Sequence, residues 1–389
     1  MSTNANDQEL LEQERMILDS VERFLERDVK PHVMHLEHND IYPDEIVEKM
    51  KELGLFGAII PEEFGGLGLR PSTYAKVIEK IATVWMSLSG IINSHLIMAF
   101  IVNKKGTQAQ KEYFLPRFAT GELRGGLALT EPDCGTDLQA IRTLAKKDGD
   151  DYIINGTKTW ISNGIKGSCF ATLVKTDPSA DPRHKGMSMF LTVKDQGFEA
   201  SKKLEKLGYK GIDSAELIFD NYRVPAFNLI GAEEGFGMAC AITGLELGRV
   251  NVAARGVGIA QAALDESVKY SQQRKTFGKP ICQHQAIALK LADMVTRVSA
   301  ARLLVEQAAN ALDRGERCDF EAGMAKLYAT EAAINNATDA LRIHGGYGYS
   351  KEFPVERLYR DAPLLCIGEG TNEIQRLVIT KRLIEKNPV

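Results

Sequence analysis

The feature that most constrains the fold of this chain is a series of very long helical stretches toward its C-terminal end. Three of them cover about residues 236 to 273, 283 to 314 and 319 to 344, and a shorter one covers about 371 to 386. Helices of this length that are apolar over much of their surface must bury that surface against one another. We therefore predict a C-terminal four-helix bundle over residues 236–389, with further burial against neighbouring copies of the chain.

The first third of the chain also has a helical pattern of apolar residues. An amphipathic helix is expected over residues 10–29, and a second one over residues 44–53, after a Pro-Asp start signal. The pattern resumes at residue 71 and continues to about residue 102. These stretches predict an N-terminal all-α domain over residues 1–125.

The character of the sequence changes near Gly125. Short runs rich in β-branched and aromatic residues, such as 151–154, 170–175 and 187–193, alternate with clusters of Gly, Asn, Asp and Pro. Short strands without crossover helices between them favour antiparallel pairing. We predict an antiparallel β-barrel or sandwich as the middle domain, over residues 126–235.

Composition excludes several classes of partner. The 389 residues are 44% apolar and 26% charged, with a formal net charge of -4 and no long block of Lys or Arg. We therefore expect neither nucleic acid nor an anionic membrane surface as a partner. Six scattered cysteines without a Cys-x-x-Cys pair and seven dispersed histidines indicate no metal site and no disulfide framework.

The N-terminal residues lack the pattern of a secretory signal, and we find no run of about 20 apolar residues that could span a bilayer. These observations predict a cytoplasmic protein of bacterial type. A mitochondrial matrix protein without its transit peptide would show the same features.

Four polar, glycine-bearing stretches interrupt otherwise regular structure. They are Leu129 to Asp137, Trp160 to Gly164, Arg274 to Gly278 and Gly368 to Glu373. Taken singly, each also fits a structural role, as a capped turn, a core tryptophan, a helix end or a solvated turn glutamate. No dinucleotide-binding, Walker or nucleophile-elbow motif accompanies them.

Taken together, in order and spacing, the four stretches resemble the acyl-CoA dehydrogenase family, and the resemblance extends over nearly the whole chain. It implies a helical, β-barrel and helix-bundle layout, FAD as cofactor, and oxidation of an acyl-CoA thioester to trans-2-enoyl-CoA. It also implies a homotetramer, an electron-transferring flavoprotein as the electron acceptor, and a setting in fatty acid metabolism such as β-oxidation.

The resemblance assigns residues to FAD and to the substrate. Thr130 and Thr136 would contact the flavin and the thioester through their hydroxyls, and the indole of Trp160 would pack against the ring. Arg274 would pair with the pyrophosphate of the FAD on a neighbouring subunit. The implied FAD contacts are Leu127, Thr130, Gly135, Thr136, Trp160, Ser162, Arg274, Phe277, Gln285, Arg342, Gly345, Gly346, Thr371 and Glu373. The implied substrate contacts are Thr136, Glu246, Arg249 and Gly370.

Glu369 is implied as the catalytic base. It stands between Gly368 and Gly370, on a backbone that is free to enter a cavity. By resemblance it removes the α-proton while a hydride passes from the β-carbon to flavin N5, and burial should raise its pKa for that task. Some family branches carry the base at a position that matches Gly248, so this sequence supports Glu369. Gly368 replaces an aromatic residue that is frequent beside the base, which leaves the acyl chain length open.

Three alternatives to a simple dehydrogenase stay open. An acyl-CoA oxidase on the same scaffold would reduce oxygen and release peroxide. A specialised relative would act on a cyclic, branched or dicarboxylic acyl-CoA, which the product mass would show. A non-catalytic helical scaffold would bind no flavin.

Overall fold

Helices form the first part of the chain, as its apolar periodicity predicts. The structure, a computed structural model, describes residues 5–388, with side chains from residue 12 onward. The helices of this part are α1 (Ala5–Phe24), α2 (Val33–His38), α3 (Asp44–Glu52), α4 (Pro71–Lys105) and α5 (Gln108–Ala119). A π-helical segment, Leu25–Val29, continues α1, so helical structure runs through residue 29 as expected.

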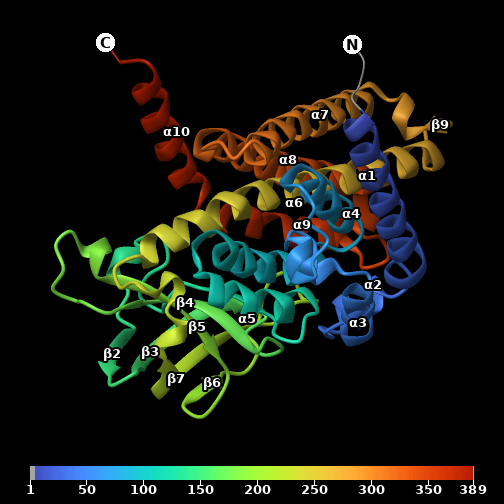
Figure 1. Cartoon of the computed structure of the whole chain (residues 1–389). Helices are drawn as coiled ribbons and strands as arrows, with labels where there is room; N and C mark the ends of the chain where they lie inside the picture. The colour runs from blue at the N-terminus through green and yellow to red at the C-terminus, as the bar shows by residue number, and fades with distance from the viewer. Residues whose placement is uncertain (1–4, 389) are drawn as a thin grey trace.

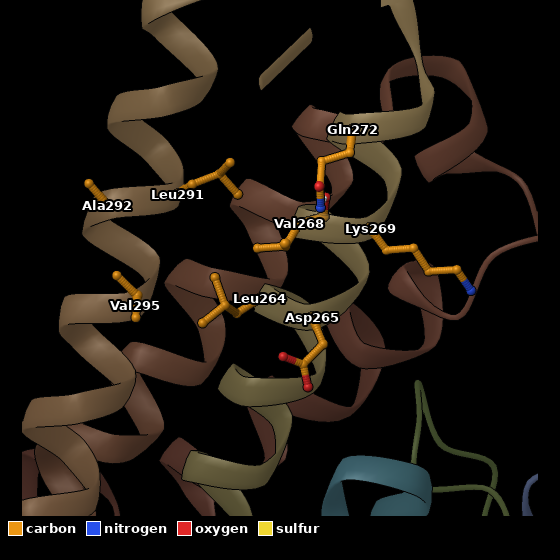
Figure 2. Close-up of a pocket in the computed structure, with 8 residues that line it drawn as sticks. All are labelled: Leu264, Asp265, Val268, Lys269, Gln272, Leu291, Ala292 and Val295. Atoms are coloured by element: carbon orange, nitrogen blue, oxygen red, sulfur yellow. The ribbon is translucent and has the colours of Figure 1, made fainter. Parts of the chain in front are cut away.

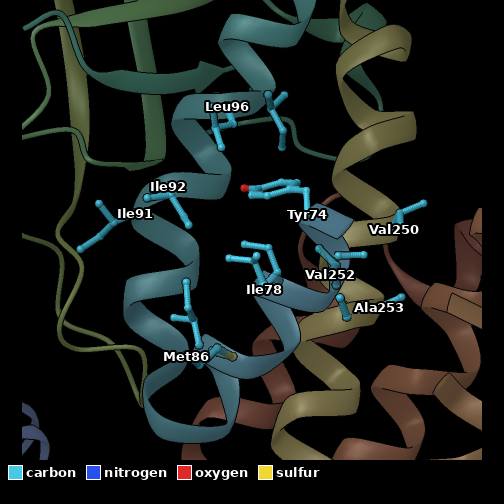
Figure 3. Packing of buried hydrophobic residues seen from close by; sticks show 14 of the residues in the cluster. Tyr74, Ile78, Met86, Ile91, Ile92, Leu96, Val250, Val252 and Ala253 are labelled. Carbon is cyan, nitrogen blue, oxygen red and sulfur yellow. The ribbon is translucent and has the colours of Figure 1, made fainter. Parts of the chain in front are cut away.

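Helix α4 consists of two limbs that meet at Trp85. This residue has φ −155° and ψ 106°, which is not helical, and its indole N–H donates to Glu37 Oε2 at 2.9 Å. Figure 3 shows the limb with Tyr74 beside the limb with Ile92, both facing α6 (Gly237–Gln273). Both limbs therefore present side chains to the same interior space.

The expectation that no segment is long and apolar enough to span a bilayer was wrong for α4. A window of 18 residues in this helix has a mean hydropathy of 1.5, so by length and composition alone α4 could cross a membrane. However, 83% of that window is buried inside the protein, because α4 packs against α6 and β1 (Gly125–Ala128). The apolar sequence reflects a core helix that is covered on most sides.

The middle of the chain forms one sheet of seven strands. Besides β1 they are β2 (Leu144–Asp148), β3 (Asp151–Ser162), β4 (Cys169–Lys175), β5 (Met187–Val193), β6 (Phe198–Ala200) and β7 (Ser214–Pro225). The pairs β2–β3, β3–β7, β4–β5 and β6–β7 are antiparallel. Figure 1 shows the sheet at the end of the molecule away from the α6–α7 connection.

The sheet confirms the predicted β domain and differs from it in two details. Strands β1 and β2 both pair with β4 in parallel. A hairpin of β2 and β3 separates β1 from β4 along the chain, so this pairing needs no tight turn. Among the strands that the structure describes, β5 pairs with β4 and not with β6, so the sheet is an open half-barrel.

Long helices form the C-terminal part, as predicted. Helices α6, α7 (Gln285–Asp313) and α8 (Asp319–His344) pack on one another, and α10 (Asn372–Lys386) packs against α8. A short hairpin of β8 (Lys275–Thr276) and β9 (Lys279–Pro280) joins α6 to α7. The sequence pattern did not predict α9 (Val355–Ile367), which also packs on α8. Pro363 lies inside this helix, and a proline in a helix interior argues against a helix when only the sequence is known.

A groove with an apolar floor runs between α6 and α7. Figure 2 shows Leu264 and Val268 of α6 facing Leu291 and Val295 of α7. Further along α7, Leu303 is 67% exposed. Uncovered apolar surface of this kind is typical of a face that another protein chain covers.

Candidate active site

Glu369 lies on a tight turn between two helices. Helix α9 ends at Ile367, and α10 begins after Thr371, whose hydroxyl accepts the N–H of Ile374 at 3.4 Å. Glu369 has φ 57°, a left-handed conformation that non-glycine residues rarely adopt. Such a conformation persists only where the surrounding structure holds it, and it is frequent at active sites.

A buried lysine holds this turn. Lys326 of α8 donates to the carbonyls of Cys366 at 3.2 Å and Gly370 at 2.9 Å, and to Asn372 Oδ1 at 2.9 Å. Its side chain is fully buried, and burial lowers the pKa of Lys326 to about 8. The ammonium group therefore fixes both sides of the turn that carries Glu369.

Replacing Lys326 by methionine should destabilise the protein and slow catalysis. The substitution leaves buried acceptors without a donor, which should lower the free energy of unfolding by about 1–3 kcal/mol. Urea denaturation and kcat measure the two effects. Lys381→Met is the matched control, because Lys381 is 72% exposed and its ion pair with Glu385 is long, at 3.9 Å. A Lys326→Met protein with the stability and kcat of the wild type would contradict the role of this lysine.

The carboxylate of Glu369 has one satisfied oxygen and one free oxygen. Its Oε1 accepts from Asn93 Nδ2 at 3.1 Å and from Arg255 Nη2 at 3.1 Å, whereas its Oε2 has no hydrogen-bond partner among the residues that the structure describes. The side chain is only 20% exposed. Burial raises the pKa of Glu369, and the nearby charges of Arg255 and Lys326 oppose that rise. The free oxygen is available to accept a proton.

Gly248 of α6 leaves room for this carboxylate. A Cβ atom at that position would lie 1.9 Å from Glu369 Oε2 and 2.9 Å from its Cδ. Position 248 is also where some family branches carry the base. The structure thus brings the two alternative base positions to the same place.

The two expected CoA-binding residues lie on α6 near Gly248. Glu246 and Arg249 are half-buried, and they form no ion pair within 4 Å in the described part of the chain. Arg249 Nε is buried without a hydrogen-bond partner, and burial together with Asp319 raises the pKa of Glu246. The two side chains are therefore not an ordinary surface pair.

An irregularity in β3 shapes the expected flavin platform. The register of β3 against β7 shifts between Lys158 and Ile161, and Trp160 within it has φ 58° and is 58% exposed. Bulges of this kind re-aim side chains. Beside it, the N–H of Thr159 donates to the carbonyl of Thr130 at 2.9 Å, which joins two of the polar stretches.

A buried ion pair supports the Thr130 loop from inside. Lys158 Nζ donates to Glu131 Oε1 at 2.8 Å and to the carbonyl of Leu129 at 3.0 Å. Glu131 also accepts the backbone N–H groups of Arg142 and Thr143. Burial lowers the pKa of Lys158 to about 8. This fixed loop presents the hydroxyl of Thr130, whereas Thr136 and Gly135 further along it are exposed.

A second cleft lies near the α6–α7 hairpin and has a volume of about 760 Å³. Arg274, Gly345 and Gly346 line it together. A Cβ at either glycine would meet nothing within 4 Å, so a ligand can approach the backbone there. Phe277 beside it is 95% exposed.

One chain does not bring all the expected FAD residues together. The β8–β9 hairpin with Arg274 and Phe277 lies at one end of the molecule and the sheet with Trp160 at the other (Figure 1). This separation agrees with the implied placement of Arg274 on the FAD of a neighbouring copy. The other expected contacts are accessible: Gln285, Arg342 and Glu373 are exposed, and Leu127, Ser162 and Thr371 are half-buried.

The residues present fit a flavin cofactor. An exposed indole, the hydroxyls of Thr130 and Ser162, and an open glycine cleft with an arginine match an aromatic ring and a pyrophosphate. The chain also carries a buried carboxylate, Glu369, with one oxygen that has no partner among the described residues. Together these features define an oxidoreductase of the flavoprotein class with an acid–base residue.

Comparison with known proteins identifies the family. Models of the acyl-CoA dehydrogenase N-terminal, middle and C-terminal domains match residues 11–122, 126–222 and 235–384. An acyl-CoA dehydrogenase of Bacillus subtilis (strain 168) is 42% identical, over 95% of this chain and 97% of the relative. Acryloyl-CoA reductase (NADH) of Anaerotignum propionicum is 40% identical, over 98% and 96%. The structure of butyryl-CoA dehydrogenase from Megasphaera elsdenii gives a TM-score of 0.93 at 36% identity, over 99% of this chain and 100% of that chain.

The chain belongs to the acyl-CoA dehydrogenase family. It is an oxidoreductase with FAD as its cofactor. Membership in this family removes the non-catalytic scaffold from the alternatives.

Sequence reasoning missed several polar residues around Glu369. Asn251 and Arg255 lie three and seven positions after Gly248, which places them on the same face of α6. Asn93 is a polar residue in the apolar helix α4. Reading the helices for polar residues on buried faces would have found all three.

Proposed function

We propose that the protein catalyses the α,β-dehydrogenation of an acyl-CoA thioester to trans-2-enoyl-CoA, with Glu369 as the base. The observation that carries this proposal is the free Oε2 of a buried carboxylate on a strained turn, in a chain of the acyl-CoA dehydrogenase family. A weakly acidic α-proton needs a positioned base. Asn93 and Arg255 hold one oxygen of this carboxylate, and Lys326 holds the backbone of its turn at Gly370.

Charge also develops on the thioester oxygen when the α-proton leaves. The backbone N–H of Glu369 has no acceptor among the described residues, so it is free to donate to that oxygen. Arg249, with its partnerless Nε, and Glu246 are proposed to hold the CoA portion. These groups orient the thioester against the base.

We propose that Thr130, Thr136, Trp160 and Ser162 hold the flavin ring, and that Arg274, Phe277, Gln285, Arg342, Gly345 and Gly346 hold the remainder of an FAD on a neighbouring copy. When bound, FAD supplies the acceptor for the β-hydride. The separation of the two residue groups in one chain supports a homo-oligomer, and the family resemblance favours a tetramer.

The direct test is an anaerobic titration of the purified protein with acyl-CoAs while the visible flavin absorbance is followed. Bleaching by an acyl-CoA, with formation of an enoyl-CoA of two mass units less, is the expected result. If no acyl-CoA reduces the flavin, the proposed dehydrogenation is wrong.

The pH dependence of kcat/KM should report the ionisation of Glu369. Only the ionised carboxylate accepts a proton, and burial raises its pKa above the usual 4.5. Activity is therefore low below that pKa and rises as the pH passes through it. Since Arg255 is the strongest of the charges that oppose the rise, Arg255→Gln should move the acidic limb to higher pH. An acidic limb at the same pH in the variant would contradict this assignment.

The direction of the reaction in the cell is a separate question, because one of the relatives at 40% identity is an acryloyl-CoA reductase (NADH). The same base, when protonated, can return a proton to the α-carbon. Oxidation of NADH in the presence of an enoyl-CoA would favour the reductive direction. Reduction of an electron-transferring flavoprotein by an acyl-CoA would favour dehydrogenation, and rapid peroxide release would indicate an oxidase.

A further inference from the structure

A cluster of buried polar side chains extends from Glu369 into the space between α4 and α6. Its members share near-complete burial, with exposed fractions of 5% or less. They are Tyr74 and Asn93 of α4, Tyr209 of the β6–β7 loop, and Asn251 and Arg255 of α6. We call this set the polar cluster.

The polar cluster is connected by hydrogen bonds to the base. Arg255 Nη1 donates to the hydroxyl of Tyr209 at 3.0 Å, and Arg255 Nη2 donates to Glu369 Oε1 at 3.1 Å. Asn251 Nδ2 donates to Asn93 Oδ1 at 2.6 Å, and Asn93 in turn donates to Glu369. Arg255 and Asn93 therefore bond directly to the group that must reach the α-carbon, and Tyr209 and Asn251 lie one hydrogen bond further away.

Three polar atoms of the cluster have no partner. They are the hydroxyl of Tyr74, Arg255 Nε and Asn251 Oδ1, all buried. Figure 3 shows the hydroxyl of Tyr74 pointing from its limb of α4 toward the limb with Ile92 and Leu96. Leaving a buried polar group without a partner is destabilising. Unpaired atoms concentrated in one place indicate a ligand with polar groups.

The unpartnered donors indicate that this ligand carries a hydrogen-bond acceptor. Two of the three unpartnered atoms, the hydroxyl of Tyr74 and Arg255 Nε, can donate a hydrogen bond. Glu369 accepts from a different nitrogen of Arg255, Nη2. A plain alkyl chain offers these donors no acceptor, whereas a carboxylate close to the reacting carbons does. The planar guanidinium retains an unused N–H at Nε, which suits a carboxylate.

We propose that the acyl group of the substrate carries a second carboxylate, on the β- or γ-carbon, which Arg255 and Tyr74 bind. This inference rests on the proposed acyl-CoA dehydrogenation and narrows its substrate to a dicarboxylic acyl-CoA. Asn93 and Tyr209 hold Arg255 and Glu369 in place, and the apolar residues around them exclude water.

The test compares substrates that differ only in the distal group. The wild-type holoenzyme is assayed with succinyl-CoA and glutaryl-CoA, their ω-amides, and butyryl-CoA and pentanoyl-CoA, by anaerobic flavin reduction. Whichever of succinyl-CoA and glutaryl-CoA is the better substrate should have a kcat/KM roughly 100-fold higher than that of its ω-amide and of the alkyl thioesters. A loss of this size corresponds to about 2.8 kcal/mol, within the range of charge-assisted hydrogen bonds.

Two variants separate recognition from a general effect on the base. Arg255→Gln raises the pKa of Glu369 and so changes catalysis with every substrate. The informative quantity is therefore the ratio of kcat/KM for the carboxylate to that for its amide. That ratio should fall to near one in Arg255→Gln and fall by roughly 10-fold in Tyr74→Phe. Arg302→Gln is the matched control, since Arg302 of α7 pairs with Glu79 of α4 and does not belong to the polar cluster. Its ratio should equal that of the wild type, with retained FAD content and melting temperature as checks on folding.

The outcomes are distinguishable. If alkyl acyl-CoAs reduce the flavin as efficiently as the dicarboxylic ones, or if the ratio is unchanged in Arg255→Gln, the dicarboxylic inference is overturned and the dehydrogenase function stands. If none of these thioesters, and no other acyl-CoA, reduces the flavin, the proposed function falls and the inference falls with it.

Discussion

Glu369→Gln should give a folded, FAD-containing protein whose flavin is reduced by acyl-CoA about 10²–10⁴-fold more slowly than in the wild type. Glutamine keeps the shape of the side chain, and its carbonyl oxygen can still accept from Asn93 and Arg255. What it loses is the basicity of Oε2, the free oxygen. Anaerobic stopped-flow measurement of flavin absorbance gives the rate directly.

The matched control for this variant is Glu316→Gln, which makes the same change at a residue paired with Arg314 on the surface. It should reduce its flavin at the wild-type rate. Wild-type rates in Glu369→Gln would show that another residue is the base.

Gly248→Ala should impair catalysis with little effect on stability. The added methyl would lie 1.9 Å from Glu369 Oε2, and the flexible end of that side chain would have to move away. Displacement of a catalytic group by about 1 Å can cost roughly 100-fold in rate. Alanine is also the better helix former, which offsets part of the crowding.

Measurement of kcat together with the melting temperature separates the two effects of Gly248→Ala. Gly323→Ala on α8 makes the same change where the new Cβ would approach Ile379 no closer than 3.2 Å, and it should retain the wild-type kcat. Normal kcat in Gly248→Ala would mean that the carboxylate does not act from the position seen in the structure.

The long helices α6, α7 and α8 were predictable because their length forces apolar faces to repeat over many turns. Helix α9 was not, since it is only 13 residues long and has Pro363 in its interior. The break at Trp85 was equally hidden, because Trp85 stands in a continuous apolar run and the carboxylate that binds its indole, that of Glu37, is distant in the sequence. Parallel pairing of β1 with β4 depends on which strands meet in space, and short runs of apolar residues do not contain that information.

The residues of the candidate site were likewise only in part predictable from the sequence. Glu369, Trp160 and Arg274 stand in glycine-bearing stretches that are visible in the sequence. Arg255 and Lys326 lie within regular helices, where a single charged residue looks like ordinary surface until the packing is known. Their roles depend on contacts between α6, α8 and the turn at Glu369, which are more than 40 residues apart along the chain.

The convergence of Gly248 and Glu369 has a consequence for how relatives of this protein are compared. A base on α6 and a base on the turn before α10 would occupy one location in space although they are remote in the sequence. A column-by-column alignment would record such relatives as having lost the catalytic glutamate. The reacting carbons would meet a carboxylate in both cases. Whether a relative has a catalytic base should therefore be judged from the position of its carboxylates in the structure and not from one alignment column.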